Sequence, residues 1–77
     1  MTERELRQLF AKRISRRLVA LNIDQRELAK RSGLSEATVS RYIKGWRKPT
    51  YDIVIRIAQA LECEPGDLIN IEEPLEI

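Results

Sequence analysis

The sequence contains no histidine, a single cysteine and only 5% aromatic residues. Without histidine, Cys63 has no partner for a Cys–His metal site, and alone it cannot form a disulfide within the chain. No nucleophile–base set and no glycine-rich phosphate loop is present, and the chain is too short for a substantial pocket. We therefore expect a protein that is not an enzyme and that holds no metal and no cofactor.

Long hydrophobic runs are also absent. No apolar segment approaches the length of a membrane-spanning helix, and the N-terminus lacks the apolar segment of a signal peptide. Together with the lone cysteine, these absences favour a cytoplasmic protein. The chain has 77 residues, of which 43% are hydrophobic, and this composition fits one small packed domain.

The net charge of +2 hides a strong asymmetry along the chain. Residues 1–50 contain thirteen basic and five acidic side chains, a net charge of +8. Residues 51–77 contain one basic and seven acidic side chains, a net charge of −6. A basic half is typical of a protein with a polyanionic partner, although on composition alone ordinary solvated charge is an equally good explanation.

Capping signals and apolar spacing predict about five short helices. Thr2 and Glu5 form a capping box at the start of a long first helix. Its buried face repeats at three- and four-residue steps, through Leu6, Leu9, Phe10, Ile14, Leu18 and Leu21. Thr50 caps a fourth helix, and Pro65 opens a short last one. The predicted fold is all-α, a compact helical bundle around one core.

The most informative stretch is residues 25–45. Asp24 caps a short helix there, and Glu27 completes a capping box. Gly33 supplies the left-handed residue that ends this helix, and Ser35 caps the next one. Two short helices joined by a turn that contains glycine make a helix-turn-helix, which presents its second helix to the major groove of DNA.

This stretch resembles the Cro/cI-type helix-turn-helix family, also called the XRE or lambda-repressor-like family. The resemblance covers roughly residues 12–70 and implies a lambda-repressor-like domain that binds double-stranded DNA. We predict one DNA-binding domain over residues 1–70 and a short tail over residues 71–77. The matching residues are Gln25, Leu28, Ala29, Gly33, Leu34, Ser35, Thr38, Val39, Ser40, Ile43, Lys44, Gly45, Arg47, Lys48, Pro49, Thr50, Ile57, Ala58, Gln59, Ala60 and Leu61.

The second helix of the motif, residues 36–44, turns Val39, Tyr42 and Ile43 inward at about 100° per residue. The candidate base-contacting residues lie opposite or on the flanks: Ser35, Glu36, Ala37, Thr38, Ser40 and Arg41. Arg41 is the sharpest candidate, because a guanidinium forks onto the two acceptors of guanine. The alternative is an exposed arginine that touches only solvent or phosphate. Glu36 can accept from cytosine, or it can simply stabilise the first turn of the helix.

Candidate phosphate contacts need only a charge or a donor with sufficient reach. They are Arg17, Gln25, Arg26, Lys44, Arg47 and Lys48, and Gln25 is included because the resemblance implies a bond from its amide to phosphate. Trp46 has two interpretations, contact with the sugar–phosphate edge of DNA or coverage of the core. The second interpretation is the commoner fate of a lone tryptophan. Cys63 is expected to pack as a small apolar residue between the last two helices.

These observations predict a sequence-specific transcriptional regulator, a repressor that binds a near-palindromic operator as a homodimer. Leu68, Ile69 and Ile71 are candidate dimer contacts, and for Ile69 and Ile71 the alternative is core or a frayed tail. A second hypothesis is an antitoxin, in which the domain binds DNA while the acidic tail occupies a toxin. A third hypothesis, a protein-interaction module without DNA binding, is disfavoured by the retained Gln25, Arg41 and Lys44.

Overall fold

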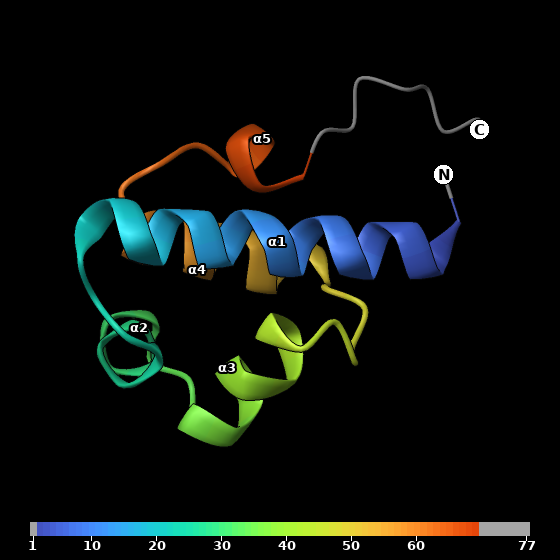
Figure 1. Ribbon diagram of the computed structural model, residues 1–77. Helices are drawn as coiled ribbons and strands as arrows, with labels where there is room; N and C mark the ends of the chain where they lie inside the picture. The colour runs from blue at the N-terminus through green and yellow to red at the C-terminus, as the bar shows by residue number, and fades with distance from the viewer. Residues whose placement is uncertain (1, 70–77) are drawn as a thin grey trace.

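The computed structural model describes residues 2–69, and every regular element in this range is a helix (Figure 1). The helices are α1 (Glu3–Leu21), α2 (Gln25–Ser32), α3 (Glu36–Ile43), α4 (Tyr51–Ala60) and α5 (Pro65–Leu68). The predicted all-α bundle is confirmed. None of these helices is both long and apolar enough to cross a membrane.

The helices begin at the residues that their local signals indicate. Thr2 Oγ1 accepts the backbone N–H of Glu5 at 3.1 Å, and the Glu5 carboxylate accepts the N–H of Thr2 at 2.8 Å. This is the predicted capping box, and its backbone hydrogen bond lowers the pKa of Glu5. Ser35 and Thr50 cap α3 and α4, each by accepting the backbone N–H three residues ahead.

The capping box predicted at the start of α2 is only half formed. Asp24 Oδ1 accepts the N–H of Glu27 at 2.9 Å, as expected. The Glu27 carboxylate does not return the bond, and it accepts from Arg31 Nε at 2.9 Å instead. Glu27 and Arg31 lie one helical turn apart, and a hydrogen bond with charge on both partners is stronger than one to a neutral amide.

The core is built around α1. In Figure 1, α2 and α3 lie on one side of α1, α5 lies on the other, and α4 passes behind it. The buried core residues are Phe10, Ile14, Leu18, Leu28, Ala29, Val39, Tyr42, Val54, Ile57, Ala58, Ala60, Leu61, Leu68 and Ile69. The rings of Phe10 and Tyr42 meet edge to face with their centroids 5.8 Å apart, which joins α1 to α3.

At the end of the described chain, the burial of two side chains contradicts their predicted role as dimer contacts. Leu68 and Ile69, the candidate dimer contacts, are 0% and 7% exposed and belong to the core of a single chain. Such a small domain needs their apolar area to complete its own core, so these side chains have almost no surface to offer a second copy. Ile71, the third candidate, lies outside the described residues.

Cys63 lies in the turn between α4 and α5 and packs against the core, as predicted for a small apolar residue. Burial raises the pKa of its thiol above the ordinary value, and the nearby Arg17 only partly opposes this. The thiol is therefore neutral at physiological pH, as expected for a packing residue rather than a reactive one.

Candidate nucleic-acid interface

The turn between α2 and α3 holds the two helices in a fixed relation. Gly33 has a φ of 74°, and the N–H of Leu34 donates to the carbonyl of Ala29 at 3.1 Å. A Cβ at Gly33 would meet nothing closer than 3.7 Å, so the left-handed backbone, rather than lack of space, favours glycine here. The cap at Ser35 then starts α3 two residues later.

One side of α3 is buried and the opposite side faces solvent. Val39 and Tyr42 are buried, whereas Glu36, Ala37 and Arg41 are exposed. This orientation agrees with the one deduced from helical spacing. Contact of the exposed side with bases stays a prediction.

The two hydroxyls at the start of α3 bond to each other. Ser35 Oγ accepts the backbone N–H of Thr38 at 3.1 Å and donates to Thr38 Oγ1 at 2.9 Å. The Ser35 hydroxyl is therefore committed to the cap, while Thr38 keeps its own hydroxyl proton for a further bond. Ser40, further along α3, is half-buried.

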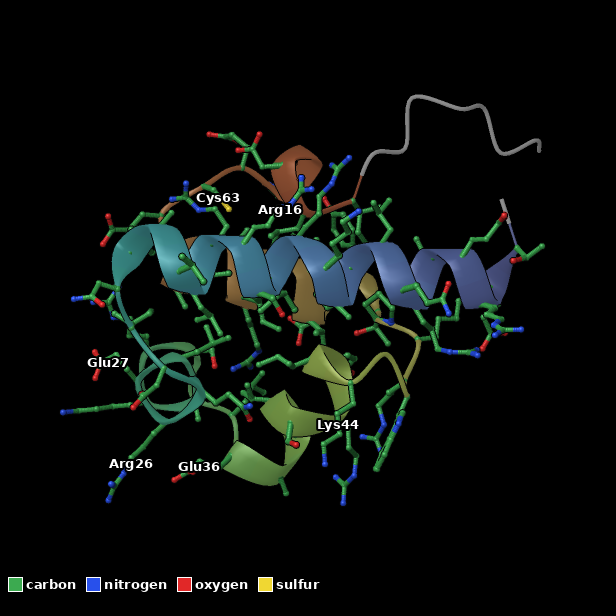
Figure 2. All side chains as sticks on the ribbon, in the orientation of Figure 1. Arg16, Arg26, Glu27, Glu36, Lys44 and Cys63 are labelled. Atoms are coloured by element: carbon green, nitrogen blue, oxygen red, sulfur yellow. The ribbon has the colours of Figure 1, made fainter. Side chains whose placement is uncertain are left out.

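Figure 2 shows Arg26, Glu36 and Lys44 on the α2–α3 side of the molecule, whereas Arg16 and Cys63 lie on the other side of α1. Arg26 Nε lies 3.9 Å from a carboxylate oxygen of Glu36, and these side chains are 84% and 64% exposed. An ion pair so long and so exposed adds little to stability, and either partner can exchange it for a contact with DNA. Gln25, the first residue of α2, is also exposed.

Four exposed basic residues follow one another from the end of α3 into the next loop. We call them the open cations; they are Arg41, Lys44, Arg47 and Lys48. None of them makes an ion pair with a residue in the range 2–69. Lys44 Nζ lies 4.6 Å from the centre of the Trp46 ring. This spacing is within the range of a cation–π interaction.

Trp46 is exposed, contrary to the interpretation favoured from the sequence. The favoured interpretation placed its ring over the core, but the residue is 69% exposed. The backbone at Gly45 lies directly against α1, since a Cβ there would be 3.7 Å from the carbonyl oxygen of Arg7 and 3.8 Å from the Ala11 side chain. The loop thus packs its backbone at Gly45 against α1 and buries Pro49, while the indole stays in solvent.

Arg17 lies far from the open cations. Its Nη2 donates to the carbonyl of Leu61 at 2.7 Å, and more weakly to that of Glu62 at 3.4 Å, in the turn after α4. Its Nε is buried without a hydrogen-bond partner in the described range. We therefore leave Arg17 out of the candidate interface.

Three other arginines also donate to backbone carbonyls. Arg7 donates to Gly45 at 3.1 Å, while Arg13 donates to Asp67 and Arg31 to Ala60, each at 3.3 Å. We call Arg7, Arg13, Arg17 and Arg31 the carbonyl-bound arginines. A signal for two of them exists in the sequence, because Arg13 and Arg17 immediately precede the core residues Ile14 and Leu18 and so flank the apolar face of α1.

Comparison with known proteins agrees with this geometry. A sequence model described as helix-turn-helix matches residues 13–68, which is more than half of the chain. No curated protein matches the chain. Among solved structures, the chain is similar to the restriction-modification controller protein C.AhdI from Aeromonas hydrophila. That match has a TM-score of 0.78 and 28% sequence identity, and it covers 82% of this chain and 96% of that one.

Proposed function

This chain belongs to the XRE-type helix-turn-helix family of DNA-binding transcriptional regulators, and we propose that it is a repressor that binds a near-palindromic operator as a homodimer. The family is one of DNA-binding regulators and not of enzymes. Its membership confirms the resemblance seen in residues 25–45. The proposal beyond family membership concerns which residues read the DNA and how the protein acts.

The observation that carries the proposal is the orientation of α3. The helix is held against α1 and α2 by Val39 and Tyr42, and its other side is exposed and continues into the open cations. A helix whose direction is fixed by a core can enter the major groove without loss of conformational freedom. The positive charge beside it attracts phosphates on both edges of that groove.

Within the groove, we assign the main base contact to Arg41. It is exposed, has no acidic partner among the described residues, and carries the donor geometry that guanine accepts in bidentate fashion. Glu36 is the second candidate, as an acceptor for cytosine. Ala37 and Thr38 can offer at most methyl contact with thymine, a hydroxyl hydrogen bond or a phosphate contact, and Ser40 is small enough to let the helix sit deeply.

Phosphate contacts are assigned to exposed donors around α3. Gln25 and Arg26 lie at the start of α2, where the free N–H groups of the helix end add to the attraction for an anion. Lys44, Arg47 and Lys48 would bind phosphates at the other end of α3. These contacts fix the position of the protein on DNA without reading sequence.

The proposal of a homodimer rests on the resemblance to the Cro/cI-type family and not on Leu68 or Ile69, which are buried. The antitoxin alternative depended on the acidic tail, residues 71–77, which lies outside the described range. No described feature favours that alternative.

Selection of bound sites from random duplex DNA tests the proposal. We expect enrichment of a near-palindrome whose half-sites are about 10 base pairs apart, as two copies of α3 on one face of DNA require. The same selection with Arg41→Ala should lose the preference at one base pair of each half-site. Recovery of single half-sites would contradict the dimer, and binding without any enriched sequence would contradict specific recognition.

A further inference from the structure

Trp46 is the chain's only tryptophan, and it leaves most of its surface in solvent next to the proposed DNA-binding helix. An exposed indole is a large apolar area for a small domain, whose tryptophan normally contributes to the core. The side chain is not isolated, because the ammonium of Lys44 lies over its ring. The pair therefore combines an apolar surface and a positive charge on one short segment.

The backbone around this pair is anchored on both sides. Gly45, between the two residues, has a φ of 73°, and its carbonyl accepts from Arg7 Nε at 3.1 Å. Pro49, three residues after the tryptophan, is buried. The indole and the ammonium are thus presented from a loop that is fixed to α1, and little conformational freedom is lost when a partner binds.

We propose that Trp46 and Lys44 form a clamp for the sugar–phosphate backbone of double-stranded DNA at the edge of the half-site read by α3. The exposed indole packs against deoxyribose, and its Nε1–H can donate to a phosphate oxygen. The ammonium of Lys44, already held beside the ring, binds the same stretch of phosphates. This proposal rests on the DNA-binding function proposed above.

Charge and position favour DNA over a protein partner on this surface. Arg47 and Lys48 directly follow the indole and are exposed without an acidic partner among the described residues. An apolar protein surface that covered Trp46 would also desolvate these cations, whereas a DNA backbone neutralises them. The surface is continuous with α3, so one ligand can occupy both.

The chain supplies its own probe, because fluorescence excited at the red edge of the absorption band reports Trp46 alone. We expect operator DNA to reduce quenching of this fluorescence by acrylamide several-fold, with a stoichiometry equal to that of binding measured through labelled DNA. Unchanged quenching while the labelled DNA is fully bound would overturn the clamp and leave the proposed function standing. Failure to bind any duplex DNA would overturn both.

Concentration separates DNA from a second copy of the chain as the occupant. Raising the protein concentration without DNA should leave the quenching unchanged. Protection that develops without DNA would show that Trp46 faces another protomer, and the clamp would be wrong.

Substitutions then test the two parts of the clamp. Trp46→Ala should weaken binding to operator and to scrambled DNA alike, on the order of tenfold, with nearly unchanged salt dependence. Trp46→Phe should recover most of this loss, because a ring face remains. Lys44→Gln should lower the slope of log K against log salt by about one unit. Val19, on α1, is also apolar and strongly exposed. Val19→Ala is therefore the matched control and should bind normally.

Circular dichroism should show all variants folded, since both side chains are exposed. Equal binding by Trp46→Ala and the unchanged protein would contradict the proposal. A loss confined to operator DNA would also contradict it, because it would indicate base reading instead of backbone contact.

Discussion

The open cations and the carbonyl-bound arginines are all basic residues, but they have opposite roles in the structure. Arg41, Lys44, Arg47 and Lys48 hold their charges in solvent beside α3. The carbonyl-bound arginines instead fasten one part of the fold to another, and three of the four originate on α1. The number of basic residues in a sequence therefore overestimates the number available to DNA.

The end of α4 shows why arginines are used in this way. This helix has no basic residue in its last turn, and the carbonyls at a helix end lack partners within the helix. Arg31 from α2 donates to Ala60, and Arg17 from α1 donates to Leu61. Cations from two other helices thus stabilise the negative end of α4, and at the same time they fix how the helices pack.

The largest effect that separates the two sets is expected in DNA recognition. Arg41→Ala should reduce discrimination at one base pair in each half-site by about 1–3 kcal/mol, because a bidentate contact to guanine is lost. Titration of operator and single-base variants measures this. The free energy of unfolding should stay within about 0.5 kcal/mol, since the side chain is exposed. Equal weakening on operator and scrambled DNA would show that Arg41 is only a phosphate contact.

The converse result is expected for Arg17. Arg17→Ala should lower the free energy of unfolding by about 1–2 kcal/mol, because the carbonyl of Leu61 loses a charged donor. The loss of stability is limited because the Nε of Arg17 is buried without a hydrogen-bond partner among the described residues, which already costs free energy in the unchanged protein. Urea unfolding measures it, and Arg16→Ala, at the exposed neighbour on α1, is the matched control that should change little. Equal stability of these two variants would contradict the structural role of Arg17.

A smaller effect is expected at the start of α1. The pKa of Glu5 is lowered from its ordinary 4.5 by the hydrogen bond from Thr2, so the carboxylate contributes stability above pH 4.5. That contribution should fade as the pH falls below 4.5 and through the folded-state pKa. Glu5→Gln should remove this part of the pH dependence in urea unfolding. An identical acid profile for both proteins would show that the ionised Glu5 carboxylate adds nothing in solution.

The sequence predicted those features that depend on neighbouring residues. The caps at Thr2, Ser35 and Thr50 and the left-handed Gly33 follow from groups at most a few positions apart, and all are confirmed. The pairing of Glu27 with Arg31 was missed although it is local, because two partners competed for one carboxylate.

Features that depend on distant segments could not be read in this way. The bond from Arg17 to Leu61 joins residues 44 positions apart, and it exists only because the turn after α4 returns to α1. The exposure of Trp46 depends on the path of the loop after α3, which is joined to α1 by the bond from Arg7 to Gly45. The burial of Leu68 depends on where α5 packs. The base and phosphate contacts depend on DNA, so they stay predictions.

The salt dependence of DNA binding tests most directly whether DNA contacts the open cations beside α3 rather than basic residues elsewhere on the surface. The slope of log K against log salt should be measured for two double variants with the same change in net charge. Arg47→Gln with Lys48→Gln should lower the slope by about two units, because two phosphate contacts are lost. Lys12→Gln with Arg16→Gln, at exposed positions of α1, should leave it nearly unchanged. Equal slopes for the two double variants would show that DNA responds only to net charge and would contradict a defined interface around α3.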